Sequence, residues 1–340
     1  MTQKTSFTVM TYNILFGGQN RISDIETVIR AINPDILGIQ EANDPQKLAG
    51  LADRLEMNYQ IGLVKSGFHL AILTKFPIVS FQLFENPIFQ KGLIEAVLDI
   101  PGEEQYWHIY VGHLTANFSQ GYAAEKQRER EVKEYIALME TAQTQKRPHI
   151  LLGDFNALAP GEMFRVNKLI QAVTQFDKKR KAADAKMQGL PHLNYIIPPP
   201  LRPFSPLIRS LAHAKPLADA MNSTVNTLIP RKAARALLNA DYIDCLAMYY
   251  GPKDVPPTCP NPLPAGRIDY IWADIRAALR VKQCKVITPK DIPETLSASD
   301  HLPVAAILAG KAAAIKYPEP PEQDMETQFG SAAAQQSSRP

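Results

Sequence analysis

Long apolar runs are absent from this sequence. No stretch approaches the ~18 uninterrupted apolar residues that a membrane-spanning helix needs, and the start, MTQKTSF, lacks the apolar run of a secretory signal. We therefore expect a cytoplasmic protein with no transmembrane segment. At 340 residues, 45% hydrophobic and 21% charged, the composition is that of a soluble globular chain able to bury a core.

Cysteine is also scarce. The three cysteines, Cys245, Cys259 and Cys284, are odd in number and are spaced like neither a zinc site nor a disulfide framework. We therefore expect three isolated, reduced thiols rather than a disulfide-stapled fold or a Cys/His metal centre.

Apolar periodicity predicts a strand–helix–strand unit at the start of the chain. Residues 7–15 have the pattern of a buried strand, residues 22–32 have apolar side chains at helical spacing, and residues 36–40 read as a second strand. Asn13 and Glu41 lie at the two strand ends, where α/β proteins tend to place ligand groups. Both are therefore candidate site residues.

Further elements predict a mixed α/β fold. Strands are expected at 70–74, 78–83, 94–100, 107–114, 150–152, 270–272, 281–287 and 304–308, and a long charged helix at 122–143. Strands and helices mixed on a single core favour an α/β sandwich over separate domains.

The segment 157–266 has a different pattern. Helical periodicity lies near 162–176, 206–220 and 230–248, with prolines between the first two stretches. We interpret this segment as a helical, proline-containing insertion within a domain that spans 1–310. Residues 311–340 are rich in Ala, Pro, Glu, Gln and Ser, which predicts a disordered tail.

Short polar segments accompany the apolar strands in a recurring way. Their key residues are Asn13, Glu41, His113, Asp154 with Asn156, Asp269, and Asp300 with His301. Oxygen ligands hold hard cations such as Mg²⁺, and imidazole transfers protons near neutral pH. Taken singly, each residue has an ordinary surface or packing explanation. Together they indicate a hydrolase of phosphoester bonds.

Asp154 and Asn156 are two residues apart, so both should point to the same side of an extended chain. One would orient or deprotonate a water while the other donates to a phosphoryl oxygen. A turn formed by the Asp and the Asn is the alternative. An imidazole oriented by a carboxylate makes a proton-transfer pair, which His301 provides, and His113 supplies a second imidazole for the leaving group.

Basic residues are concentrated in the segment 157–266. It holds 14 Lys or Arg against 7 Asp or Glu and so carries +7, which leaves −4 for the rest of a chain whose net charge is +3. Such a segment beside an acidic site is expected where a polyanion is steered toward bound metal. A solvated surface with locally uneven charge is the alternative.

In this order, the segments TYNIL, IQEAN, AILTKFPI, GHLTA, GDFNA, RIDYIW and SDHLPV resemble the endonuclease/exonuclease/phosphatase superfamily, which shares the deoxyribonuclease I fold. The resemblance runs from about residue 7 to residue 308. It implies a four-layer α/β sandwich, in which two packed mixed β-sheets are flanked by helices.

The resemblance also implies roles. Glu41 would ligate Mg²⁺ or Mn²⁺ with help from Asn13 and Asp300. Asp154 and Asn156 would position the attacking water and the phosphoryl group. Asp269 would orient His301.

This chain departs from the family pattern at two places. Where the exonuclease III branch carries a tyrosine, it has His113, which moves it toward the deoxyribonuclease I, sphingomyelinase and deadenylase side. In deoxyribonuclease I a glutamate supports that histidine, yet residues 58–73 contain no Asp or Glu. The group that supports His113 is left open.

Three functions remain. The leading hypothesis is a divalent-metal-dependent phosphodiesterase or nuclease, and we expect it to be a monomer. The second is a phosphodiesterase or phosphatase acting on a lipid headgroup or small metabolite, with peripheral membrane contact through Ile196, Ile197, Leu201, Phe204 and Leu207 near Arg202 and Arg209. The third, a binding module without catalysis, is disfavoured because the candidate site residues are all present.

Overall fold

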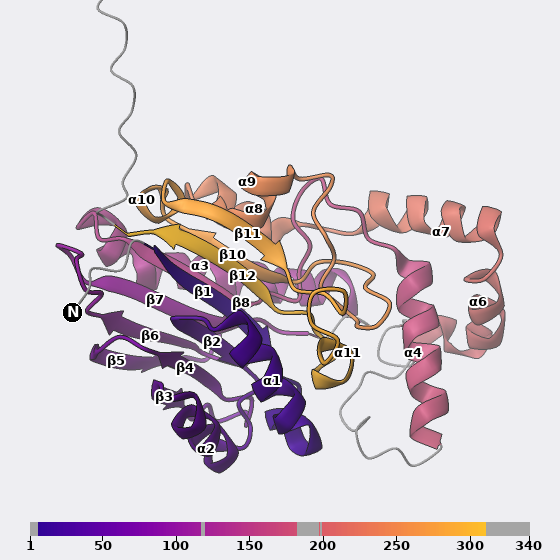
Figure 1. The fold of residues 1–340 in the computed structure, drawn as a ribbon. Helices are drawn as coiled ribbons and strands as arrows, with labels where there is room; N and C mark the ends of the chain where they lie inside the picture. The colour runs from indigo at the N-terminus through magenta and orange to yellow at the C-terminus, as the bar shows by residue number, and fades with distance from the viewer. Residues whose placement is uncertain (1–5, 117–119, 182–196, 198, 311–340) are drawn as a thin grey trace, which may run out of the picture.

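Two six-stranded sheets form the centre of the molecule (Figure 1). The computed structural model describes residues 6–116, 120–181, 197 and 199–310. Across the first sheet the order is β11 (Val281–Val286), β12 (Val304–Ala309), β1 (Ser6–Asn13), β2 (Ile36–Gln40), β4 (Leu70–Thr74) and β3 (Asn58–Gly62). Across the second it is β5 (Ile78–Phe84), β6 (Leu93–Leu98), β7 (Trp107–His113), β8 (His149–Asp154), β10 (Asp269–Ala273) and β9 (Ile243–Asp244).

Each sheet has one parallel pair at its centre, β1 with β2 and β7 with β8, and its other pairs are antiparallel. In the first pair Asn13 is opposite Gln40, and in the second His113 is opposite Asp154. Asn13, His113 and Asp154 are the last residues of β1, β7 and β8. Glu41 directly follows the last residue of β2. The polar segments therefore meet at one end of the sheets.

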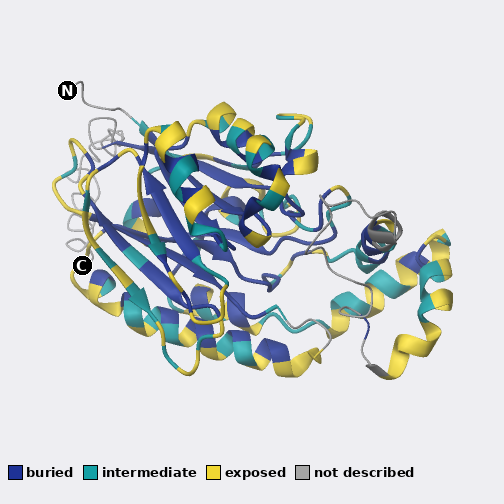
Figure 2. Cartoon of the chain, turned by 90° about the horizontal axis from the view of Figure 1, so that it is seen from below, coloured by how far each residue is buried: buried dark blue, intermediate teal, exposed yellow. Residues whose placement is uncertain are grey.

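Apolar side chains between the sheets, and on their outer faces, form separate cores. Val9 and Ile72 of the first sheet pack in one cluster with Val111 and Leu152 of the second. The outer face of the first sheet is covered by α1 (Ile22–Ile32) and α2 (Pro45–Leu55), and that of the second by α3 (Tyr122–Thr144) and α8 (Lys232–Asn239). This is the predicted four-layer α/β sandwich, with the most buried elements at its centre (Figure 2).

Local sequence explains why these helices form and where they end. In α1 the buried residues Ile25, Val28 and Ile29 make one apolar stripe, and Asn33 ends the helix in the left-handed region before Pro34. The buried face of α3 also carries charge. Its Glu131 accepts hydrogen bonds from the backbone and hydroxyl of Thr115, so the helix holds the loop after β7.

The insertion is not wholly helical, which corrects the sequence-based expectation. The pattern near 162–176 corresponds to α4 (Val166–Lys181), and that at 206–220 is two helices, α6 (Ser205–Leu211) and α7 (Lys215–Leu228). The pattern at 230–248 splits into α8, β9 and α9 (Cys245–Tyr250). Helical periodicity does not reveal this interruption, because β9 is only two residues long and its Asp244 is also the N-cap of α9.

Part of the insertion therefore belongs to the sandwich. Strand β9 extends the second sheet by pairing with β10, and α8 packs on α3. By contrast, α4, α6 and α7 stand to one side of the sheets in Figure 1, with η4 (Pro199–Phe204) leading into α6. The remaining short elements are η1 (Phe16–Arg21), α10 (Ile275–Ala278) and α11 (Thr295–Ala298).

Helix α2 and strand β3 were not among the expected elements. The predicted tail, 311–340, lies outside the described residues. None of the helices that the structure describes has both the length and the apolar character needed to cross a membrane.

A buried charge cluster ties the insertion to the second sheet. The Arg267 guanidinium donates to Asp244 at 2.8 Å and also bonds Glu162, and it lies over the Tyr270 ring at 4.0 Å. Although burial opposes its charge, the carboxylates hold the pKa of Arg267 well above its usual range. The cluster joins both ends of the insertion immediately before Asp269 on β10.

Replacing Arg267 with Met should destabilise the protein by about 3–5 kcal/mol, because it leaves two buried carboxylates without a cation. The matched control is Arg276→Met, which removes an arginine that pairs with Asp274 and is 38% exposed, and it should cost less than about 1 kcal/mol. Urea unfolding measures both. Equal small losses would contradict the importance of the cluster.

Candidate active site

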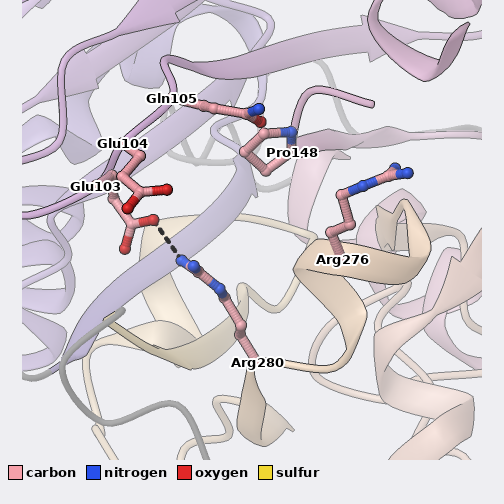
Figure 3. Close-up of a pocket in the computed structure, with 6 residues that line it drawn as sticks. All are labelled: Glu103, Glu104, Gln105, Pro148, Arg276 and Arg280. Atoms are coloured by element: carbon pink, nitrogen blue, oxygen red, sulfur yellow. Dashed lines mark hydrogen bonds and ion pairs between the residues drawn. The ribbon is translucent and has the colours of Figure 1, made fainter. Parts of the chain in front are cut away.

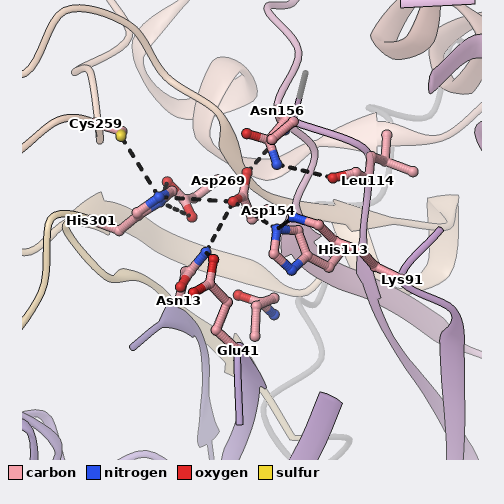
Figure 4. Close-up of polar contacts among 12 residues, drawn as sticks. Asn13, Glu41, Lys91, His113, Leu114, Asp154, Asn156, Cys259, Asp269 and His301 are labelled. Atoms are coloured by element: carbon pink, nitrogen blue, oxygen red, sulfur yellow. Dashed lines mark hydrogen bonds and ion pairs between the residues drawn. The ribbon is translucent and has the colours of Figure 1, made fainter. Parts of the chain in front are cut away.

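The predicted site residues lie together at the ends of the central strands (Figure 4). Hydrogen bonds or ion-pair contacts join Asn13 to Glu41 and Asp154, and Asp154 to His113, Asn156 and His301. Asp269 is joined to His301 in turn. Apart from Asp300, the network contains every residue that the sequence predicted for the site.

Asp154 is the centre of this network. Its Oδ2 accepts from Asn13 Nδ2 at 3.0 Å and lies 3.2 Å from His113 Nε2 and 3.8 Å from His301 Nε2. Burial favours the neutral carboxyl, yet the two histidines hold the pKa of Asp154 well below its usual range. Asp154 is thus an ionised carboxylate between two imidazoles.

Asn156 reaches Asp154 through a turn, and the expectation of two residues on one extended strand is wrong. Strand β8 ends at Asp154, Asn156 has a left-handed φ of 47°, and its backbone N–H donates to Asp154 Oδ1 at 2.9 Å. Its side-chain amide donates to the Leu114 carbonyl at 3.0 Å. The turn alternative therefore describes the backbone, and that turn itself holds the two side chains together.

Glycine allows the strand ends that carry these residues to approach closely. A Cβ at Gly153 would lie 2.2 Å from the Gly112 carbonyl oxygen, a distance that no side chain tolerates. Gly112 and Gly153 directly precede His113 and Asp154. Glycine at 153 thus permits the backbone contact that brings His113 beside Asp154, and glycine at 112 leaves room for the Tyr135 ring.

Asp269 and His301 form a carboxylate–imidazole pair. Both carboxylate oxygens of Asp269 lie 3.0 Å from His301 Nδ1, and Thr258 Oγ1 donates to Asp269 at 2.5 Å. Burial disfavours the imidazolium, but Asp269 and other negative groups raise the pKa of His301 well above its usual range. Because Nδ1 is occupied, Nε2 is the nitrogen that faces Asp154.

Glu41, Asn13 and Asp300 offer oxygen atoms that suit a hard cation. Glu41 is held by the Phe16 N–H at 2.8 Å and by the Asn13 amide at 3.2 Å, so its carboxylate has a defined position. Asp300 is buried, and its Oδ1 has no hydrogen-bond partner among the described residues. Burial, together with the charge of Glu41, raises the pKa of Asp300 to about 6.

This donor set fits Mg²⁺ or Mn²⁺, because a divalent cation would neutralise the unpartnered buried carboxylate. Two other groups of potential ligand atoms share His301: Cys259 with Asp300, and Asp154 with Asp269. They fit such a cation less well. His301 Nδ1 is engaged by Asp269, and burial raises the pKa of the Cys259 thiol to about 12, which keeps it neutral.

Lys91 is a member of the site that sequence reasoning missed. Its Nζ lies 2.6 Å from His113 Nε2, whereas His113 Nδ1 has no partner among the described residues. A single lysine ahead of β6, outside every quoted motif, carries no sequence signal of this contact. The group beside His113, which the sequence left open, is therefore a lysine.

A surface hollow elsewhere on the molecule is separate from this network (Figure 3). It is lined by Glu103, Glu104, Gln105, Pro148, Arg276 and Arg280. Pro148 precedes β8, and residues 103–105 precede β7, so the hollow lies at the ends of these strands opposite His113 and Asp154. The Arg280–Glu103 ion pair, at 2.6 Å, occupies part of it.

Comparison with known proteins supports the same interpretation as the geometry. The model of the endonuclease/exonuclease/phosphatase family matches residues 10–301. The chain belongs to this family. Membership supports hydrolysis of phosphoester bonds as its activity. Among curated proteins, none matches the sequence significantly.

Several solved structures share the fold of this chain at low sequence identity. The human Nocturnin catalytic domain is 17% identical in sequence, with a TM-score of 0.57. The match covers 90% of this chain and 95% of the Nocturnin domain. An AP endonuclease from Archaeoglobus fulgidus is 17% identical with a TM-score of 0.56, covering 89% and 99%. A 3'-5' exonuclease from Neisseria meningitidis is 16% identical with a TM-score of 0.58, covering 89% and 99%.

Replacing Asp300 with Asn should raise the melting temperature of the metal-free protein by a few degrees at pH 8. The folded-state pKa of about 6 lies above the unfolded value, so ionisation of Asp300 opposes folding as the pH rises through this range. The gain should shrink near pH 4, where Asp300 is protonated in the folded state. Thermal unfolding in chelator measures it; a loss of stability at pH 8 would contradict the unpaired carboxylate.

Proposed function

We propose that this protein is a divalent-metal-dependent phosphodiesterase. One observation carries the proposal: an ionised Asp154 lies between His113 and His301, in direct contact with Asn13 of the oxygen-rich set. Groups that can transfer protons and groups that could hold a cation therefore lie around Asp154. All of the predicted site residues are present, which disfavours a binding module without catalysis.

The residues of this chain suggest a division of labour. Asp154 would accept a hydrogen bond from the attacking water, which requires the ionised form. Asn156, fixed by its turn, would donate to the phosphoryl group, and His301, held by Asp269, would stabilise its negative charge. Glu41 and Asp300, with Asn13 beside them, would hold Mg²⁺ or Mn²⁺, which supplies a Lewis acid for a phosphoryl oxygen.

Nucleic acid is the first substrate to test. The segment 157–266 carries +7, and phosphate contacts by Lys and Arg dominate nucleic-acid affinity. Two of the similar structures are an AP endonuclease and a 3'-5' exonuclease. His113, in place of the tyrosine of the exonuclease III branch, makes abasic-site cleavage a weaker proposal. A monomeric state and a cytoplasmic location remain predictions.

A lipid headgroup is the second candidate, because three apolar residues are exposed beside the insertion's basic ones. Leu201, Phe204 and Leu207 are exposed in η4 and α6, close in sequence to Arg202. The expected contribution of Ile197 is wrong, since this side chain is buried in the α4 cluster. Ile196 lies outside the described residues.

Activity should require Mg²⁺ or Mn²⁺ and should be lost in EDTA. In Glu41→Gln, which removes the charge but keeps the size, half-maximal activity should need at least about tenfold more metal. The control is Glu129→Gln on the solvent side of α3, which should titrate like the wild type. Full activity in chelator, or an unchanged metal titration for Glu41→Gln, would contradict the metal proposal.

Neutralising Lys178, Lys179, Arg180 and Lys181 together should separate the two substrate classes. If this run contacts a nucleic-acid backbone, the variant should bind DNA or RNA more weakly and with a flatter salt dependence, because fewer counterions are released. Hydrolysis of bis(4-nitrophenyl) phosphate serves as the control and should hardly change. Loss of binding to anionic vesicles, with nucleic-acid cleavage intact, would favour the lipid candidate instead.

A further inference from the structure

His113 lacks the partner that would hold it as a charged acid. Its Nδ1 is buried without a hydrogen bond among the described residues. Asp154 is the carboxylate that contacts its ring, with Oδ2 lying 3.2 Å from Nε2. Burial, followed by the charge of Lys91, lowers the pKa of His113. A lowered pKa favours the neutral imidazole, which can accept a hydrogen bond at Nε2.

Lys91 stands where that proton is needed. Its Nζ is 2.6 Å from His113 Nε2 and 4.7 Å from the centroid of the Phe68 ring, which packs edge-on against His113. Two protonated nitrogens repel at such a distance, so one of them must present a lone pair to the other. A single proton therefore lies between Lys91 Nζ and His113 Nε2, and the Lys91 ammonium lies over the Phe68 ring.

Its surroundings make Lys91 a better proton donor than an ordinary lysine. Burial lowers its pKa, while the negative charges of Glu41, Asp154 and Glu131 favour its cation. Of the two side chains, Lys91 is 8% exposed and His113 only 1%, so Lys91 is the more accessible to a bound molecule.

The pair also lies on the correct side of the site. His301 and the Lys91–His113 pair reach Asp154 from opposite sides (Figure 4). In an in-line displacement at phosphorus the attacking and leaving oxygens are on opposite sides of the reacting atom. A group across the site from the Asp269–His301 pair is therefore placed for the leaving oxygen.

We propose that Lys91, hydrogen-bonded to His113, is the catalytic residue that protonates the leaving oxygen. This inference rests on the proposed phosphodiesterase function and names an acid for it. As water oxygen bonds to phosphorus, the bond to the leaving oxygen breaks and its electron pair stays on that oxygen. The proton shared by Lys91 and His113 moves onto it, the water's proton passes to Asp154, and exchange with solvent restores both groups.

The test varies the leaving group. Aryl methyl phosphates that differ only in the aryl ring, from phenyl to 4-nitrophenyl, are assayed for kcat/KM at saturating Mg²⁺ or Mn²⁺. Phenolate needs a proton to leave, whereas 4-nitrophenolate is a weak base. Lys91→Met should therefore lose about 100-fold or more on the phenyl ester and less than about tenfold on the 4-nitrophenyl ester.

Lys91→Arg separates proton donation from charge. Arginine keeps the positive charge but holds its proton too tightly to transfer it, so it should recover little of the loss on the phenyl ester. Equal losses on all esters, or full rescue by arginine, would show an electrostatic role only and overturn the proposal. Lys133→Met, on the exposed side of α3, is the matched control and should leave the series unchanged.

Misfolding of the variant and a lack of phosphodiesterase activity in the wild type give different results. If Lys91→Met does not fold, as judged by thermal unfolding, the leaving-group dependence of Lys91→Arg decides alone: a steeper dependence than the wild type supports the proposal, and an unchanged one overturns it. If the wild-type protein cleaves none of these esters and no DNA, RNA or phospholipid, the proposed function fails, and the assignment of Lys91 fails with it.

Discussion

The hydrogen bond from Asn13 to Asp154 joins the two sheets at the point where the site is built. The two residues are 141 positions apart and end the central strands β1 and β8. Their contact exists only because the apolar faces of the two sheets pack together, with Val9 and Ile72 against Val111 and Leu152. The polar network therefore depends on burial of the central core, and the core in turn buries Asp154.

Burial decides the chemistry of the network. In water Asp154 would be an ordinary carboxylate, but here it is enclosed by an amide and two imidazoles that keep it ionised. The pKa of Asp300, whose buried Oδ1 has no hydrogen bond within the described part of the chain, shifts in the opposite direction. Loss of solvation disfavours both anions. Neighbouring groups outweigh it at Asp154, whereas Asp300 would be stabilised as an anion by a bound cation.

Buried charge anchors the insertion in addition to the apolar packing of α8 on α3. Arg267 bonds Glu162 at its start and Asp244 near its end, while Glu125 of α3 accepts from the first backbone amides of α8. A buried arginine with two carboxylates contributes little net stability, yet removal of one partner is costly. It therefore sets the position of β9, β10 and, two residues beyond Arg267, of Asp269.

The sequence by itself determined the sandwich, and it predicted most of the residues that lie together in the candidate site. Buried strands have a residue pattern that is local, and the polar residues that follow them are read in chain order, as for Glu41 after β2 and His113 at the end of β7. Tertiary structure alone decided which side chains touch. Packing between segments remote in the chain places Lys91 beside His113, sets the turn at Asn156 and buries the carboxylate of Asp300. No local pattern encodes such packing.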